Sequence, residues 1–223
     1  MTGRPLRVAL LAVGIVLTGL LGLVAIFDGA DTYRDIARSS GVTQVTFHAP
    51  PDLAWYVGLE GLVDLHQRTL GYVQGDRSEL PQFAATARPL FDDNERSHMA
   101  DVRAVFQATK VAFVAGLLIL AGVLRWTPRP FRVRLARDAA VAAGIGVAVI
   151  AAAAAVAFDP LFLLFHEVFF PQGNFLFGPD SNLLTLYPDQ YWYGVTLRIG
   201  LAFVALMAAL ALAATVTLRQ ARR

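Results

Sequence analysis

Four long apolar runs constrain this chain more than any other feature of its sequence. The runs extend over Leu6 to Phe27, Val105 to Leu124, Ala139 to Phe158 and Val195 to Leu218. A bilayer core about 30 Å thick requires roughly 20 helical residues, so each run is long enough to cross it. Hydrophobic residues make up 56% of the 223 residues, above the roughly 45–50% that is usual in soluble domains. The sequence therefore predicts an all-α membrane protein with four transmembrane helices.

These runs divide the rest of the chain into connecting segments. The first run follows Arg4 and Arg7 like a secretory signal, but its apolar part exceeds the roughly 7 to 15 residues of such a signal, which indicates an uncleaved span. The predicted segments are a first transmembrane helix at 1–27, an extracytoplasmic domain at 28–93, an outer helix continuing into the second span at 94–124, a basic cytoplasmic loop at 125–138, the third span at 139–158, an interfacial helix and extracytoplasmic loop at 159–194, the fourth span at 195–218 and a cytoplasmic tail at 219–223.

The arginines predict the orientation. Five of them lie between Arg125 and Arg137, and others lie at both ends of the chain. By the positive-inside rule, these segments and both termini are cytoplasmic. All the Asp and Glu residues except Asp138 then lie on the outer side or at its interface. The pI near 9.2 thus reflects membrane topology, and it does not indicate a nucleic-acid partner.

The Ala and Gly content of the third run and the absence of cysteine give two further constraints on the structure and chemistry of the chain. The third run is rich in Ala and Gly, which predicts close helix packing because small residues let helices approach one another in lipid. The chain has no cysteine. It therefore has no disulfide framework, no thiolate metal site and no thiol nucleophile.

The extracytoplasmic domain is predicted to be mostly helical. D-T-Y-R-D-I-A-R-S-S-G indicates a short helix ending at Gly41, and V-T-Q-V-T-F-H-A alternates like a strand before Pro50 and Pro51. An amphipathic helix is expected from an Asp52 cap to Gly75. This interpretation makes His48 and His66 solvated surface residues.

A first histidine candidate lies at the outer end of the second span. In F-D-D-N-E-R-S-H-M-A-D-V-R, Asp93 or Asn94 is the expected N-cap, and no helix breaker follows before Leu124. Residues three and four apart share a helix face, so Asn94, His98 and Asp101 are expected on one side. The helix is longer than the bilayer requires, which predicts that His98 lies just above the outer boundary.

A second histidine candidate follows the third span. L-F-L-L-F-H-E-V-F-F-P is too short to cross a bilayer and too apolar to leave it, so we expect an interfacial or re-entrant helix ending at Pro171. His166 and Glu167 are its polar residues, and an ionisable group at membrane depth is a functional candidate. A structured loop follows. The aromatic residues beyond it are expected to form an interfacial belt; they are Tyr187, Tyr191, Trp192 and Tyr193.

The motifs N-E-R-S-H-M-A-D-V-R, F-H-E-V-F-F-P-Q-G-N-F-L-F and L-L-T-L-Y-P-D-Q-Y-W resemble the lipoprotein intramolecular transacylase (Lit) family of bacterial membrane proteins. The resemblance implies transfer of the sn-2 acyl chain of a diacylglyceryl lipoprotein to the α-amino group of its N-terminal cysteine. It also implies that His98 and His166 match the family's functional histidines. The expected location is the bacterial cytoplasmic membrane, with the active site on the extracytoplasmic side.

The residue chemistry suits such a transfer. An α-amino group titrates near 7.7 to 8.0 and histidine near 6.5, so two histidines could serve as base and acid at neutral pH. Asp101 could fix the tautomer of His98, and Asn174 and Arg198 are candidate oxyanion donors. Diacylglyceryl lipoproteins and membrane lipid are the expected partners, and no cofactor or metal is expected. Which histidine is the base, and the oligomeric state, stay open.

Two alternatives remain at this stage. His98, Asp101, His166 and Glu167 could build a metal-dependent hydrolase of membrane lipids or esters, although no dense ligand motif such as H-E-x-x-H is present. A non-catalytic membrane protein whose outer domain binds a partner is the other alternative. Replacing either histidine would leave the activity of such a partner protein largely intact.

Overall fold

The computed structural model describes residues 3–49, 53–84 and 86–222. The chain folds into two compact units. The span unit comprises Met1–Ile26, Thr109–Val156 and Thr196–Arg223, and the histidine unit comprises Phe27–Ala108 and Ala157–Val195. Two continuous helices, α4 (Asp93–Trp126) and α8 (Asp189–Gln220), contribute residues to both units.

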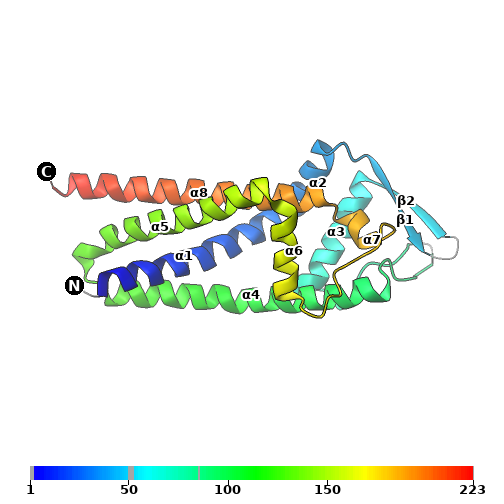
Figure 1. Cartoon of the computed structure of the whole chain (residues 1–223), viewed down its shortest axis with the longest axis horizontal. Coiled ribbons are helices and arrows are strands. Elements are labelled where there is room, and N and C mark those ends of the chain that lie inside the picture. Colours follow the sequence, from blue (N-terminus) through cyan, green and yellow to red (C-terminus); the bar gives the residue numbers. More distant parts are fainter. Residues whose placement is uncertain (1–2, 50–52, 85, 223) are drawn as a thin grey trace. The chain divides into compact units, whose positions relative to one another are not determined.

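Four long helices confirm the predicted spans (Figure 1). They are α1 (Gly3–Phe27), α4, α5 (Arg129–Val156) and α8, and each is long and apolar enough to cross a membrane. The helices extend beyond the apolar runs, since α5 begins inside the arginine-rich stretch. Thr127 and Pro128 alone separate α4 from α5. The chain turns there because proline removes a backbone donor, while Thr127 bonds back to the carbonyl of Val123 at 2.7 Å.

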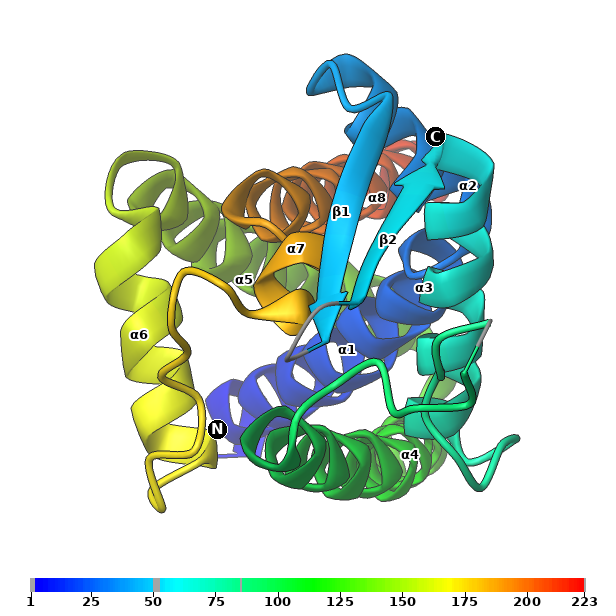
Figure 2. The ribbon, with the colours of Figure 1, turned by 90° about the vertical axis from the view of Figure 1, so that its right-hand side faces the viewer.

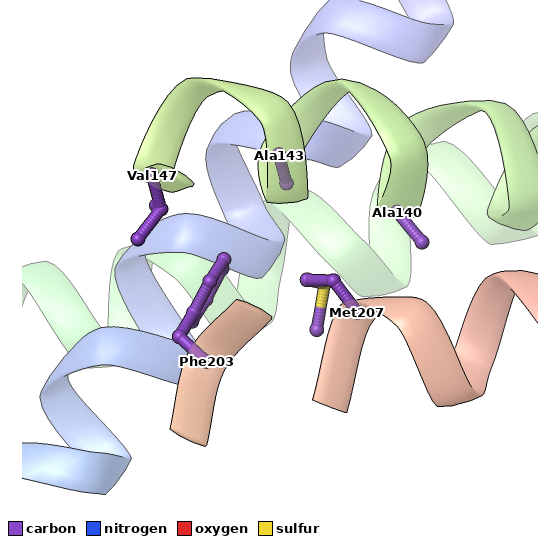
Figure 3. Packing of buried hydrophobic residues seen from close by; sticks show 5 residues of the cluster. All are labelled: Ala140, Ala143, Val147, Phe203 and Met207. Carbon is purple, nitrogen blue, oxygen red and sulfur yellow. The ribbon is translucent and has the colours of Figure 1, made fainter. Parts of the chain in front are cut away.

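Small residues of α5 pack against large ones of α8 in the span unit (Figure 3). Ala140, Ala143 and Val147 lie on one helix face and contact Phe203 and Met207. α1 covers the same cluster with partly buried apolar side chains. The close helix packing predicted from the alanines of the third run is therefore confirmed, because an alanine face leaves room for a phenylalanine ring.

The histidine unit combines a β-hairpin with short helices (Figure 2). Its remaining elements are α2 (Ala30–Ser39), β1 (Gln44–Ala49), β2 (Leu53–Gly58), α3 (Leu59–Gln74), α6 (Phe158–Phe169) and α7 (Asn182–Leu186). β1 and β2 are antiparallel, with Phe47 opposite Trp55. α2 packs against α3, and α7 contacts both β1 and α3.

The prediction of a helix from residue 52 onward was wrong for its first part. Residues 53–58 form β2, because the apolar run L-A-W-Y-V pairs with β1 and buries the Val57 side chain, while Tyr56 beside it is exposed. α3 begins only at Leu59, with Gly58 as its N-cap. Its predicted end is confirmed, since Gly75 adopts a left-handed conformation with φ 91°. The predicted roles of Pro50, Pro51 and Asp52 lie outside the described residues.

The N-cap of α4 also differs from the prediction. Asp92 caps the helix, one residue before the expected Asp93 or Asn94. The Asp92 carboxylate accepts from the Glu95 N–H at 2.8 Å, and the Glu95 carboxylate accepts from the Asp92 N–H at 2.8 Å. This reciprocal pair is a capping box, which satisfies two backbone donors at the helix start.

His66 is buried, so its prediction as a solvated residue was wrong. Only 1% of it is exposed, since the apolar side of α3 packs inside the unit. Tyr187 and Tyr191 are also buried and surround His66 together with Tyr33. These two tyrosines therefore form part of a core rather than an exposed aromatic belt.

Candidate functional site

The two candidate histidines meet in the histidine unit. His98 lies in the second turn of α4 and His166 in the last turns of α6. Their ring centroids are 5.8 Å apart and the ring planes differ by 23°. Two imidazoles at this separation can act on the same small group from two sides.

His98 is almost fully buried under aromatic rings. It is 6% exposed, with the ring centroid of Phe170 at 4.7 Å and that of Phe177 at 5.5 Å. Its Nδ1 is buried and has no hydrogen-bond partner within the described part of the chain. A buried polar atom without a partner is rare in folded proteins and points to a functional role for the group.

A backbone contact fixes the tautomer of the neutral His166 ring. Its Nδ1 lies 2.8 Å from the carbonyl oxygen of Phe162. A carbonyl oxygen only accepts, so Nδ1 carries the hydrogen and Nε2 of the neutral ring keeps its lone pair. The Phe162 ring lies 4.3 Å from the imidazole and the Phe175 ring 5.2 Å from it, between centroids.

The α6–α7 loop, residues 170–181, connects these rings to α4 through four polar side chains. Asp101 Oδ2 accepts from Asn174 Nδ2 at 2.6 Å and from Gln172 Nε2 at 2.7 Å. Asn174 Nδ2 also donates to Ser97 Oγ at 3.2 Å. We call Ser97, Asp101, Gln172 and Asn174 the polar latch. Because both amide hydrogens of Asn174 are used here, its side chain serves the loop in this conformation rather than an oxyanion.

Glu95 fixes the other end of the loop. It is 2% exposed and lies one helical turn before His98 on α4. Its Oε1 accepts from the Leu183 N–H at 2.9 Å and from the Ser181 hydroxyl. Ser181 is the N-cap of α7, so one buried carboxylate connects the start of α4 to the start of α7.

The structure brings together most of the residues predicted from the sequence. His98, His166, Asp101 and Asn174 lie in one group, as the contacts above show. Arg198 belongs to the span unit, and its predicted role stays a prediction. Within residues 3–49, 53–84 and 86–222, no group of three or more His, Asp and Glu side chains is placed to hold a metal ion.

Several site residues were not predicted from the sequence. Phe162, Phe170, Phe175 and Phe177 surround the two imidazoles. Gln172 joins the polar latch. The density of phenylalanines on both sides of Pro171 was the available signal, but in a membrane segment that density is also expected for lipid contact.

Comparison with known proteins adds a family match. A family model described as "Lipoprotein intramolecular transacylase Lit" matches residues 50–192. The matched range includes both histidines and the polar latch. A search of curated proteins gives no match.

Solved structures show the same fold. The chain is similar to the membrane-integral lipoprotein intramolecular transacylase Lit from Bacillus cereus, with a TM-score of 0.68 at 14% identity, over 97% of this chain and 98% of that one. A variant of that protein with a histidine replaced by arginine matches with a TM-score of 0.64 at 13% identity, over 98% and 94% of the two chains. An alanine variant matches with a TM-score of 0.68 at 12% identity, over 98% and 95%.

Proposed function

The chain belongs to the lipoprotein intramolecular transacylase (Lit) family and is a membrane protein, and on this premise we propose that it moves the sn-2 acyl chain of a diacylglyceryl lipoprotein to the α-amino group of its N-terminal cysteine. The product is a lyso-form lipoprotein. The observation that carries the proposal is the pair of imidazoles 5.8 Å apart inside a shell of phenylalanines.

His166 is assigned as the base. Its Nδ1–H is held by the Phe162 carbonyl, which leaves Nε2 free to accept a proton. The neutral substrate amine attacks the ester carbonyl carbon, and a C–N bond forms as the carbonyl π electrons move to oxygen. Nε2 of His166 then takes one proton from the resulting ammonium. A positioned base of this kind contributes about 10²- to 10⁴-fold to the rate.

His98 is assigned as the acid. The tetrahedral intermediate collapses when the oxyanion re-forms the C=O bond and the bond to the glyceryl oxygen breaks. The leaving alkoxide requires one proton, and His98 is the second proton-transfer group within reach of the same small volume. His98 is neutral before the reaction, because burial lowers its pKa from 6.5 to about 4. It takes the proton that His166 removed from the amine and gives it to the alkoxide, so atoms and charges balance over the cycle. Backbone N–H groups of the α6–α7 loop are the proposed oxyanion donors.

The apolar surroundings support acyl transfer rather than hydrolysis. Phe170 is buried and Phe162, Phe175 and Phe177 are partly buried around the imidazoles, so little water reaches them. Excluding water prevents it from competing with the amine for the ester. Donor ester and acceptor amine belong to one molecule, so holding them together removes most of the entropic barrier. The reaction then needs no metal, nucleotide or acyl carrier.

The proposed location is the extracytoplasmic face of the bacterial cytoplasmic membrane. The arginines between α4 and α5 and at both ends of the chain favour the cytoplasm. His98 precedes the apolar part of α4 and His166 follows α5, so both histidines lie in segments expected on the extracytoplasmic side. Lipoproteins carry their diacylglyceryl group on that side.

Co-expression with a diacylated lipoprotein tests the proposal. The N-terminal lipopeptide is analysed by mass spectrometry for the wild type, His98→Ala and His166→Ala. The wild type should give a species of unchanged mass with one acyl chain on the amine, and each variant should reduce its formation by at least about 100-fold. His48→Ala is the matched control, because that side chain is exposed and outside the site.

Other outcomes contradict the proposal. Loss of acyl mass would indicate a hydrolase, and inhibition of that loss by a chelator would indicate a metal. If the wild type leaves the lipopeptide unchanged, the proposed substrate is wrong. If both histidine variants convert it as well as the wild type, the assignment of these residues is wrong.

A further inference from the structure

Access to His98 is blocked in this structure. A residue that donates a proton to a leaving alkoxide must contact it, yet His98 is 6% exposed. Phe170 and Phe177 lie against its ring. If the proposed function holds, part of this covering must move before a substrate reaches the imidazole.

The α6–α7 loop is the covering segment with the weakest attachment. It has a backbone hydrogen bond near each end, from Gly173 N to Phe170 O at 3.0 Å and from Ser181 N to Gly178 O at 3.1 Å. Between these ends it carries Phe175 and Phe177, the rings that lie on His166 and His98. Segments with little regular backbone bonding open at low free energy.

Glycines stand on both sides of these phenylalanines. Gly173 has φ 78°, a conformation that favours glycine. A Cβ atom at Gly173 or Gly178 would meet nothing within 4 Å. The space beside these two Cα atoms is open, as expected for hinge positions.

The polar latch is the contact that holds this segment on α4. Its hydrogen bonds join side chains only, and three of the four lie at exposed positions. One oxygen, Asp101 Oδ2, accepts from both Gln172 and Asn174. Water can replace such contacts, so the latch can release without disturbing the buried Glu95 contacts at the start of α7.

We propose that residues 173–178 form a gate over His98 and His166, that Asp101 latches it through Gln172 and Asn174, and that the gate opens to admit the lipid-bearing end of the substrate. This inference rests on the proposed function for the identity of the substrate. The movement itself can be tested without any turnover.

A disulfide between α4 and the gate provides the test. The chain has no cysteine, so Ser97→Cys combined with Asn174→Cys introduces one thiol pair. In the native side chains, Ser97 Oγ and Asn174 Nδ2 are 3.2 Å apart. The full-length protein in detergent is treated with diethyl pyrocarbonate, which modifies accessible imidazoles. Mass spectrometry compares His98 with the exposed His48 in the same sample.

The gate predicts two differences in the labelling rate of His98, each measured relative to His48. The oxidised double variant should label His98 at least about tenfold more slowly than its own reduced form. Asp101→Ala should label it severalfold faster than the wild type. Equal rates in the oxidised, reduced and Asp101→Ala proteins, with the disulfide verified by mass, would overturn the proposal.

Turnover separates the gate from the proposed function. Oxidation should stop the conversion of the lipopeptide by the double variant, and a reductant should return conversion to the level of the reduced double variant. A long flexible bis-maleimide linking the same cysteines should leave conversion near that level. The wild type under the same oxidant is the control, since it has no thiol to react. If labelling responds to the disulfide but no protein converts the lipopeptide, the gate stands and the transacylase proposal fails.

Discussion

The imidazole of His66 lies almost parallel to the ring of Tyr33, with centroids 4.5 Å apart and 13° between the planes. Both its nitrogens have partners. Nε2 donates to the Asp28 carbonyl at 3.1 Å, so Nδ1 accepts from the Tyr187 hydroxyl at 3.2 Å. Asp28 in turn accepts from the Tyr191 hydroxyl at 3.2 Å. In a neutral His66 both ring nitrogens are thus satisfied, one as a donor and one as an acceptor.

Burial shifts the pKa values of His66 and Asp28 in opposite directions. It lowers the pKa of His66 from 6.5 to about 4, against the Asp28 carbonyl contact, which raises it. It raises the pKa of Asp28 from 3.8 to about 7, against the Tyr191 hydrogen bond. Between pH 4 and 6.5 the unfolded chain carries one proton on His66 and the folded chain carries one on Asp28. The pair therefore contributes almost no pH dependence to stability there.

Single substitutions should reveal the two opposed contributions. His66→Gln leaves only Asp28 to titrate. The raised pKa of Asp28 stabilises the folded protein fully below pH 3.8, and this stabilisation is lost as the pH rises to 7. Asp28→Asn leaves His66, whose lowered pKa makes stability fall as pH drops from 6.5 to 4. Relative to the wild type, the free energy of unfolding of His66→Gln should fall by about 1.4 kcal/mol for each unit rise in pH. That of Asp28→Asn should rise by the same amount. Thermal unfolding in detergent between pH 4.5 and 6.5 measures both slopes, and equal signs would contradict the assignment.

Glu95 should be among the most sensitive positions of the histidine unit. Glu95→Ala leaves three donors without their acceptor, the N–H groups of Asp92 and Leu183 and the Ser181 hydroxyl. The expected loss is roughly 3 kcal/mol or more in the free energy of unfolding. Asp93→Ala is the matched control, since its carboxylate is exposed and pairs with Arg96, and it should cost about 1 kcal/mol at most. Similar losses for both variants would show that the buried contacts of Glu95 contribute little.

Two glycines of the span unit should respond to alanine with opposite signs. A Cβ at Gly19 would lie 2.7 Å from the Phe203 ring, whereas one at Gly146 would meet nothing within 4 Å. Gly19→Ala should destabilise by about 1–3 kcal/mol, because the buried ring has no room to move. Gly146→Ala should stabilise by roughly 0.5–1 kcal/mol through reduced backbone entropy of the unfolded chain. The thermal midpoints of the two variants measure the difference, and a stable Gly19→Ala protein would mean that α1 and α8 pack less closely.

The contact between Asp101 and Asn174 should tolerate exchange better than single substitution. Asn174→Asp places two carboxylates at the 2.6 Å contact and should reduce lipopeptide conversion about tenfold, since the loop would be repelled from α4. Combining it with Asp101→Asn restores one donor and one acceptor and should recover most of the loss. A double variant no better than Asn174→Asp would show that Asp101 acts otherwise than through this contact.

Local patterns were sufficient for much of the fold. The four spans, the β1 strand, the end of α3 at Gly75 and the short helix ending before Pro171 agree with the structure. Each follows from neighbouring residues alone. The length of an apolar run shows whether its helix can cross a membrane. Glycine and proline end a helix or strand because of the conformations that their own backbone allows.

The pairings that build the site required the tertiary structure. Residues 53–58 form a strand because they pair with β1. His66 is buried because Tyr33, Tyr187 and Tyr191 enclose it. The sequence by itself determined a four-span membrane protein with His98 and His166 next to apolar segments. Only the tertiary structure decided that the two rings face each other and that the α6–α7 loop covers them. Such contacts join residues far apart in the chain, and their free energy depends on distances that local pattern does not encode.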